Sequence, residues 1–280
     1  MTCEPTREPD RRTAQPAART ALQGGDEAQR TGESGAPVAR EAPPQAMTHV
    51  VALSGGKDST AMALRLAEVE PREYVYICTP TGRELPEMEA HWSRLETLLG
   101  APLLRVTNGS LDSWIREWNA LPNFRMRWCT RVLKIEPMKA WLLAHHQPCM
   151  HYVGLRADEE TRDGVYGEVA SFTDYPLRRW GWTLADVRGY LAQRAVRIPP
   201  RTDCDLCFFQ RIDEWKALLR HHPERYAEGE AYEALTGASF RTPGRDSWPV
   251  TLADFRKEVE RQPDLGLEAE DGERCRACSL

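Results

Sequence analysis

Apolar and polar positions along the first two thirds of the chain predict strands that alternate with helices. Short runs rich in β-branched and aromatic residues are typical of buried strands, and longer runs with one apolar face are typical of helices. We expect strands at 49–53, 74–78, 103–106 and 151–154, and helices at 59–67, 87–99, 135–145 and 183–191. Gly100 suits a helix end, and Thr183 with Asp186 suits a helix cap. This alternation predicts a doubly wound, mostly parallel α/β sheet with helices on both faces.

After Cys207 the pattern becomes helical. We expect helices at 211–221, 224–236 and 252–262. The sequence therefore predicts an α/β domain over residues 47–203, followed by a helical, cysteine-containing extension over 204–280.

Residues 1–46 differ from the rest of the chain in composition. They contain no Phe, Trp or Tyr, and Leu22 and Val38 are their only branched aliphatic residues. Such a segment buries too little apolar surface to offset the entropy lost on ordering. We expect a disordered leader that the fold, beginning at Met47, does not need. The leader is either a flexible interaction tail or the result of a misassigned start codon.

Composition and charge narrow the class of protein. The 280 residues carry a formal net charge of −5, which argues against a uniformly basic nucleic-acid coat but leaves room for a local basic cleft. No run approaches the roughly 18 apolar residues of a membrane helix, and the N-terminus lacks the apolar stretch of a secretory signal. We therefore expect a cytoplasmic protein. In that reducing compartment we expect its eight cysteines to be metal ligands or reactive thiols in preference to disulfides.

The first predicted strand runs directly into the glycine-rich sequence SGGKDS, which a helix follows. Glycines allow a ligand to approach the backbone closely, and a helix N-terminus presents free N–H groups and a partial positive charge. The spacing matches neither the Walker loop nor the G-x-G-x-x-G motif. We expect a nucleotide phosphate site formed by Ser54, Gly55, Gly56, Lys57, Asp58 and Ser59, with Asp58 as a candidate Mg²⁺ ligand.

The SGGKDS sequence resembles the SGGxDS loop of the PP-loop nucleotide α-hydrolases, which include ATP pyrophosphatases and adenylyl-sulfate reductases. Later segments resemble the phosphoadenosine phosphosulfate (PAPS) reductase branch, and the overall pattern resembles its phage and mobile-element members. The matching segments are Thr81-Gly82 with Pro86-Glu87, Cys129 with Lys134 and Pro137, Gly154–Glu160 with Arg162, Tyr175–Leu177 with Trp180, Trp182 and Asp186-Val187, and Cys204–Cys207. The resemblance covers about residues 47–210 and implies an adenine nucleotide α-hydrolase-like fold that binds an adenine nucleotide.

Three departures from the reductase pattern weaken the expectation of sulfonucleotide reduction but leave that of nucleotide binding. Pro80 stands where the family's DTG motif has Asp, and Thr130 stands where the second Cys of its CC pair would be. The C-terminal catalytic ECGLH motif of the assimilatory reductases is absent from the sequence. The resemblance therefore supports nucleotide binding strongly and sulfonucleotide reduction weakly.

Two C-x-x-C pairs, Cys204 with Cys207 and Cys275 with Cys278, have the spacing of paired thiolate ligands. Cys129 lies among basic residues, which we expect to lower its pKa. Two assignments stay open. In the one that the resemblance favours, Cys129, Cys204 and Cys207 hold a 4Fe–4S cluster, with a C-terminal cysteine or an exogenous sulfur on the fourth iron. In the other, the two pairs bind a structural zinc and Cys129 is catalytic.

Two classes of function follow. The first is an enzyme that binds ATP, PAPS or adenylyl sulfate (APS) with Mg²⁺ and acts at the α-phosphate or the attached sulfate. It either adenylates a nucleic acid or a small acceptor for sulfur transfer, or it reduces PAPS or APS to sulfite. The expected catalytic residues are Lys57, Asp58, Cys129, Arg156 and Arg162, and Thr81 and Gly82 join the loop in nucleotide binding.

A sulfur or electron donor protein is a candidate partner of such an enzyme. The second class is a non-catalytic module that binds a nucleotide and a metal within a complex acting on nucleic acid. Pyrophosphate release from ATP and Mg²⁺ distinguishes the two classes.

Overall fold

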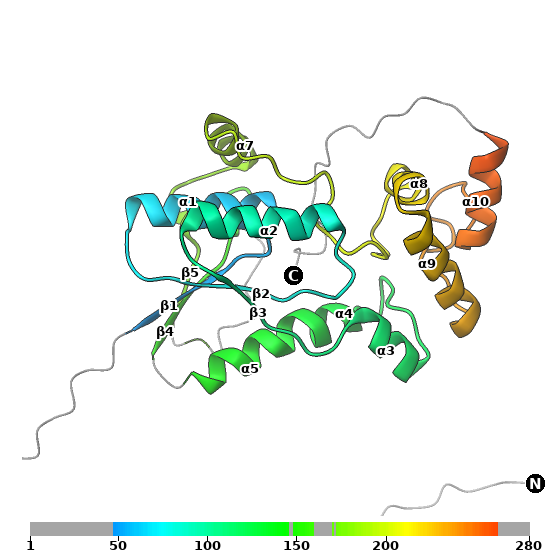
Figure 1. Cartoon of the computed structure of the whole chain (residues 1–280), viewed down its shortest axis with the longest axis horizontal. Coiled ribbons are helices and arrows are strands. Elements are labelled where there is room, and N and C mark those ends of the chain that lie inside the picture. The colour runs from blue at the N-terminus through cyan, green and yellow to red at the C-terminus, as the bar shows by residue number, and fades with distance from the viewer. Residues whose placement is uncertain (1–46, 146–147, 160–169, 171, 263–280) are drawn as a thin grey trace, which may run out of the picture. The chain divides into compact units, whose positions relative to one another are not determined.

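The fold is described from a computed structural model, which covers residues 47–145, 148–159, 170 and 172–262. Within these residues five strands form one sheet in the order β3-β2-β1-β4-β5 (Figure 1). The strands are β1 (Thr48–Ala52), β2 (Val75–Cys78), β3 (Leu103–Arg105), β4 (Cys149–Tyr152) and β5 (Phe172–Asp174). Every neighbouring pair is parallel, which confirms the predicted α/β sheet.

Helices cover both faces of the sheet, because successive side chains of a strand point to opposite sides. Val51 and Tyr76 pack with α1 (Lys57–Val69), α2 (Pro86–Leu99) and α7 (Leu184–Gln193). Their strand neighbours Val50 and Ile77 pack on the opposite face, against α5 (Glu136–Ala144). Figure 1 shows these two helical layers above and below the strands.

The helical structure before α5 begins earlier than the sequence predicts. It starts with α4 (Trp128–Thr130) and passes through a π-helical turn at Arg131–Ile135 into α5. In that turn the Glu136 N–H donates to the carbonyl of Arg131, five residues back. Pro137 follows and has no N–H to give to an ordinary helical bond, which accounts for the wider turn. Cys129 therefore lies in the first turn of a long helical segment.

The C-terminal helices share a second apolar core with earlier parts of the chain. They are α8 (Ile212–His221), α9 (Pro223–Thr236) and α10 (Leu252–Arg261). Trp215, Tyr226 and Phe255 from these helices pack with α4 and with α3 (Leu111–Trp118), which the sequence analysis did not predict. A further short helix, α6 (Pro176–Arg179), follows β5.

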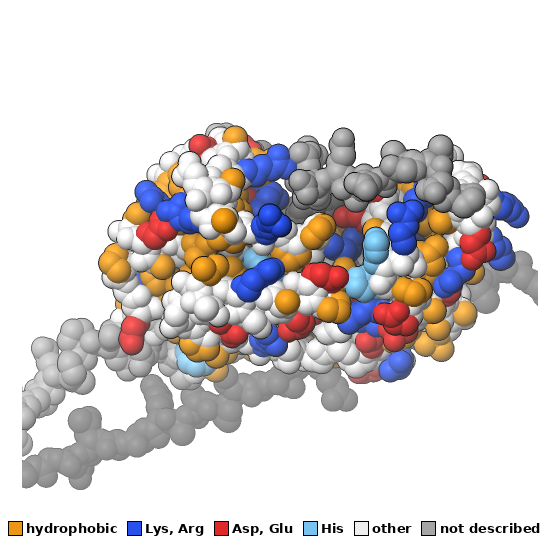
Figure 2. All heavy atoms as spheres, turned by 45° about the horizontal axis from the view of Figure 1, so that its top comes forward, with side chains coloured by type: hydrophobic (Ala, Val, Ile, Leu, Met, Phe, Trp, Pro, Cys, Tyr) orange, Lys and Arg blue, Asp and Glu red, His pale blue; other side chains and the backbone are white. Residues whose placement is uncertain are grey.

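Several predicted features lie outside the described residues. They are the leader at 1–46, Arg162, and the pair Cys275 and Cys278. Within the described part, no helix combines the length and apolar character that crossing a membrane requires. On the face in Figure 2, Lys and Arg side chains are interspersed with acidic and hydrophobic ones, in keeping with the small net charge.

Candidate functional site

The SGGKDS sequence forms the turn after β1 and the first residues of α1, at the carboxyl edge of the sheet. From β1 the chain builds the sheet in one direction through β2 and β3, and then places β4 and β5 on the other side of β1. The strand order thus reverses between β1 and β4. In open α/β sheets this reversal is where ligands bind, so residues 54–59 lie where the fold favours a site.

Two side chains of α2 hold carbonyl groups of this loop. Trp92 Nε1 donates to Ser54 O at 2.9 Å, and His91 Nε2 lies 3.1 Å from Gly55 O. Burial lowers the pKa of His91 to about 4, so the ring is neutral at pH 7 and donates from Nε2. The C=O and N–H of a trans peptide point in opposite directions. The N–H groups of Gly55 and Gly56 are therefore turned away from α2.

Two glycines keep the loop in this position. Gly55 has a φ of +86°, and a Cβ there would lie 2.2 Å from Met88 Cε. Gly154, after β4, approaches the loop from the other side: its Cβ would lie 3.2 Å from the backbone nitrogen of Ser59. Side chains at either position would displace the loop or the start of α1.

The two serines of the loop brace it from within. Ser54 Oγ and Ser59 Oγ lie 3.1 Å apart, and Ser59 Oγ donates to Gly56 O at 3.1 Å. The Gly56 N–H makes a long contact of 3.4 Å with Ser54 Oγ. These hydroxyls hold the loop as a tight turn.

Asp58 is the centre of the charged groups at the loop. Its Oδ2 accepts a hydrogen bond from Arg156 Nη1 at 2.9 Å, and Lys57 Nζ lies 3.7 Å from the same oxygen. Arg156 also contacts Asp158 at 2.8 Å and Glu159 at 3.6 Å. Burial raises the pKa of the Asp58 carboxyl, against the charges of Lys57 and Arg156. Asp58 Oδ1 is buried with no hydrogen-bond partner among the described residues, which suits the expected Mg²⁺ ligand.

Three of the predicted cysteines come together at a small cavity. Cys129 from α4 and Cys204 and Cys207 from the segment before α8 line it, together with Thr81 and Lys134. A hydrogen bond with Cys207, along with burial, raises the pKa of Cys204 well above its usual range. The structure thus brings together three thiols that are more than 70 positions apart in sequence at their widest.

The prediction that basic neighbours lower the pKa of Cys129 is wrong. Burial, and then the neighbouring Cys207, raise the pKa of the Cys129 thiol, and Lys134 opposes them only in part. Buried thiols resist ionisation because the charged form loses its hydration.

Thiolates are suitable ligands for a soft metal, but the arrangement of these three side chains is not that of a formed metal site. Among the described residues no three His, Cys, Asp or Glu side chains are arranged to hold an ion. The cavity has a volume of about 20 Å³, which is room for a single water. No reaction step through an iron–sulfur cluster or a zinc follows from this arrangement.

The loop after β2 lies at the same cavity and is held by Glu84. The Thr81 N–H and hydroxyl donate to Glu84 Oε1 at 2.7 and 2.8 Å, and the Gly82 N–H donates to Oε2 at 3.0 Å. These amides are therefore already paired within the loop. The sequence analysis assigned Thr81 and Gly82 to the nucleotide and did not single out Glu84.

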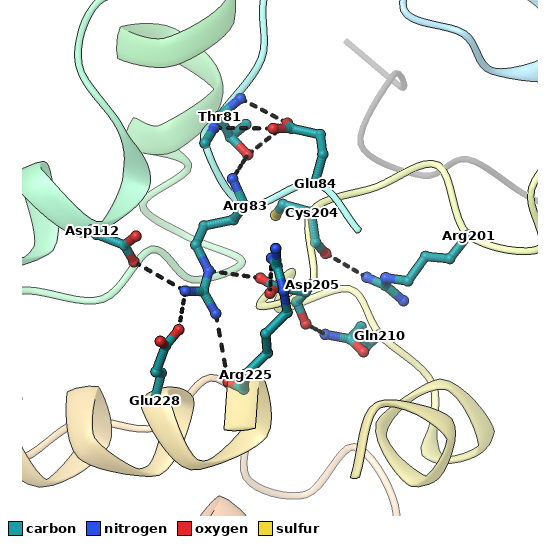
Figure 3. A network of polar contacts seen from close by, with 11 residues as sticks. Thr81, Arg83, Glu84, Asp112, Arg201, Cys204, Asp205, Gln210, Arg225 and Glu228 are labelled. Carbon is teal, nitrogen blue, oxygen red and sulfur yellow. Dashed lines mark hydrogen bonds and ion pairs between the residues drawn. The ribbon is translucent and has the colours of Figure 1, made fainter. Parts of the chain in front are cut away.

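A buried ion network joins this loop to the C-x-x-C segment. Figure 3 shows Arg83 reaching Asp205, the residue after Cys204: Arg83 Nε donates to Asp205 Oδ1 at 2.9 Å, and Arg225 Nη1 donates to Oδ2 at 2.9 Å. Arg83 also contacts Glu228, and it lies 3.6 Å from Asp112. Sequence reasoning missed these residues, although a carboxylate inside a C-x-x-C pair was a usable signal.

Comparison with known proteins gives the family. Residues 48–203 match the model of the phosphoadenosine phosphosulfate reductase domain, a segment that includes the SGGKDS loop and ends just before Cys204. An uncharacterized protein of Methanocaldococcus jannaschii is 25% identical over an alignment of 210 positions, and the match covers 65% of this chain and 44% of that protein. The chain thus spans less than half the length of this relative. The family model matches residues 48–203, which are more than half of this chain. The chain therefore belongs to the phosphoadenosine phosphosulfate reductase domain family, within the PP-loop nucleotide α-hydrolase superfamily.

Proposed function

We propose that this protein is an enzyme that binds an adenine nucleotide at residues 54–59 and acts at its α-phosphate. The observation that carries the proposal is the loop itself, at the carboxyl edge of the sheet. Its Gly55 and Gly56 N–H groups are turned away from α2, with Lys57 and Asp58 beside them. Oriented amides and a cation stabilise the negative charge that develops on a reacting phosphate.

The residues around the loop take separate roles in this proposal. Lys57 neutralises phosphate charge, and the unpaired Oδ1 of Asp58 binds the Mg²⁺ that accompanies the nucleotide. Arg156 is engaged with three carboxylates, so it holds Asp58 in position instead of contacting phosphate directly. With ATP, an acceptor oxygen forms a bond to the α-phosphorus, the bond to the β-phosphate bridging oxygen breaks, and pyrophosphate leaves.

The departures from the reductase pattern favour transfer over sulfite production. In the transfer version a sulfide-level donor attacks the adenylated carbon of the acceptor, a C–S bond forms, and AMP leaves with the acceptor oxygen. The three thiols at one cavity support a sulfur-handling role on that side of the site. Cys129, Cys204 and Cys207 are the candidate ligands of a 4Fe–4S cluster. In the alternative, the pairs Cys204/Cys207 and Cys275/Cys278 hold a structural zinc and Cys129 is catalytic.

Product analysis tests the proposal. The purified chain with ATP, Mg²⁺ and a candidate acceptor should release pyrophosphate, and AMP should follow when a sulfide-level donor is added, whereas APS or PAPS with a reductant should give little sulfite. Lys57→Ala and Asp58→Asn should lose nucleotide affinity, and Arg65→Ala, on the exposed side of α1, is the matched control. Unchanged affinity in both loop variants would show that residues 54–59 are not the nucleotide site.

An exposed aromatic and basic segment favours a nucleic acid among the expected acceptors. Phe124 and Met126 are 65% and 58% exposed, and Arg125 is exposed between them. Phe209, which lines the thiol cavity, lies 6.0 Å from the Phe124 ring and 5.0 Å from the Arg127 guanidinium. Exposed aromatic rings with interleaved arginines are typical of surfaces that bind single-stranded nucleic acid.

Fluorescence anisotropy with labelled single-stranded DNA and RNA tests this choice of acceptor. Phe124→Ala and Arg125→Ala should weaken binding, and Phe172→Ala, which removes another exposed Phe, on β5, should not. If the protein binds neither oligonucleotide, the small-molecule acceptor is the remaining candidate.

A further inference from the structure

A second and larger cavity lies between the start of α2, the segment Pro199–Arg201 and α8. Its volume is about 180 Å³, and neither the SGGKDS loop nor any of the three clustered cysteines lines it. Leu85, Pro199 and Leu218 give it an apolar wall. A cavity of roughly 150 Å³ with apolar walls is enough to take up a benzene ring. The space therefore suits a small molecule with one apolar ring or a short branched chain.

Arg201 is one of the polar side chains that line this cavity, together with Glu87, Arg211, Glu214, His221 and His222. Its side chain is 12% exposed, its Nη2 donates to Cys204 O at 2.8 Å, and its Nη1 lies 3.4 Å from Glu214 Oε1. Nε and Nη1 are both buried and make no hydrogen bond within the described part of the chain. Buried donors left without an acceptor cost free energy. The guanidinium thus offers N–H groups that a ligand oxygen can satisfy.

The acidic groups at the cavity are already engaged. Glu214 Oε2 accepts the Arg211 N–H at 2.7 Å, and Glu87 Oε1 lies 3.5 Å from His222 Nε2. Of the described side chains that line the cavity, Arg201 is the one with buried polar atoms lacking a hydrogen bond, and these atoms are donors. An arginine has no acceptor to offer, so the ligand must bring acceptor oxygens and no cationic group.

We propose that this cavity binds a small organic carboxylate. The apolar body of the ligand packs on Leu85, Pro199 and Leu218, and its carboxylate accepts hydrogen bonds from the guanidinium of Arg201. Planar carboxylates match the fork of N–H groups on arginine, and such charge-assisted bonds are the stronger ones. This site goes beyond the nucleotide chemistry and does not depend on it.

The position of Arg201 couples the cavity to the thiols. Figure 3 shows the guanidinium of Arg201 directed at the carbonyl of Cys204, on the segment whose Asp205 joins the ion network of Arg83. A carboxylate on Arg201 fixes the guanidinium, and through it the Cys204 carbonyl. Ligand in the cavity is therefore expected to slow hydrogen exchange of the backbone amides at 203–207.

Calorimetric titration of the full chain with benzoate and with benzamide, its neutral counterpart, tests the proposal. Benzoate should bind with one-to-one stoichiometry and at least tenfold more tightly than benzamide. Arg201→Gln should weaken benzoate binding at least tenfold and so remove this preference. Arg220→Gln, on the exposed side of α8, should leave benzoate binding unchanged. Benzoate should also slow exchange at 203–207 in the wild type.

A second variant decides the matter if Arg201→Gln does not fold. Ala217→Phe fills the cavity from α8 and leaves the Arg201 contact with Cys204 in place. It should abolish benzoate binding while nucleotide binding at residues 54–59 persists. Absence of benzoate binding to the wild type, equal binding of benzoate and benzamide, or full benzoate affinity in Ala217→Phe would each overturn the proposal in favour of a cavity that holds water.

Discussion

At the scale of single residues, the SGGKDS loop depends on side chains that lie outside it. Trp92 and His91 come from α2, 38 and 36 positions along the chain from the carbonyls that they hold. By fixing these two carbonyls they also fix the direction of the next two N–H groups. Their effect on a bound nucleotide is therefore indirect, through the orientation of the backbone.

The Trp92 hydrogen bond gives a test of this orientation. Trp92→Phe keeps an aromatic ring in the core and removes the N–H that holds Ser54 O. One lost hydrogen bond corresponds to about a 2- to 10-fold weaker nucleotide affinity, with a small change in melting temperature. Titration calorimetry with ATP measures it. Trp141→Phe, on α5 at the opposite face of the sheet, is the control, and equal affinity in both variants would contradict the role of Trp92.

At the scale of elements, local patterns located most helices and strands but not their exact limits. Gly100 ends α2 with a φ of +63°, and Asp186 accepts the Thr183 N–H at 2.8 Å at the start of α7, both as predicted. β4 begins two residues earlier than expected, at Cys149. The π-helical turn has no periodic signal of its own. α3 was missed although Leu111, Trp114, Ile115 and Trp118 have helical spacing and Ser110 caps the helix. Boundaries are weakly encoded because they depend on caps and packing as much as on periodicity.

Two helical glycines give a prediction about packing between elements. A Cβ on Gly229 in α9 would lie 2.8 Å from Leu206 and 2.9 Å from Leu252, which are both fully buried. A Cβ on Gly189 in α7 would meet nothing within 4 Å. Gly229→Ala should therefore lower the free energy of unfolding by about 1 kcal/mol or more, whereas Gly189→Ala should raise it by about 0.5–1 kcal/mol.

Urea denaturation of the two variants measures both effects. If Gly229→Ala is as stable as Gly189→Ala, then Leu206 and Leu252 adjust freely, and α9 does not pack tightly on the C-x-x-C segment. That result would also weaken the view that the C-terminal helices hold this segment in place.

At the scale of the whole molecule, the buried ion network ties the C-terminal helices to the sheet. Asp205 is fully buried between Arg83 and Arg225, so Asp205→Asn leaves two arginines short of their shared counter-charge. Breaking a buried pair in this way costs about 3–5 kcal/mol. Asp213→Asn removes a partly exposed carboxylate 3.3 Å from Arg211 and should cost less than about 1 kcal/mol.

Chemical denaturation compares these two variants. Equal losses in Asp205→Asn and Asp213→Asn would mean that water reaches the network and screens it. In that case the network would not position the loop after β2 against the C-x-x-C segment.

The thiol cavity is also assembled only in the whole molecule, and metal analysis tests its role. Protein purified without oxygen should contain iron and acid-labile sulfide if Cys129, Cys204 and Cys207 are cluster ligands. Replacing any of the three with Ser should remove both, while Cys78→Ala, in the core of β2, should keep them. Zinc without sulfide would favour the alternative site, and protein free of both would reject both assignments.

The class of fold, the position of the SGGKDS loop after β1 and the family could all be predicted from the sequence alone. Strand and helix periodicity, and a six-residue motif that spans the end of β1 and the start of α1, are local features, and a linear sequence records local features. The tertiary structure decided which distant residues meet: the three thiols at one cavity, Arg83 with Asp205, and Arg201 at an apolar cavity with Cys204 on its other side. It also decided that the pKa of Cys129 is raised, because burial outweighs the basic residues that flank it in sequence. Desolvation and long-range pairing depend on what the fold places around a group, and no local pattern records that.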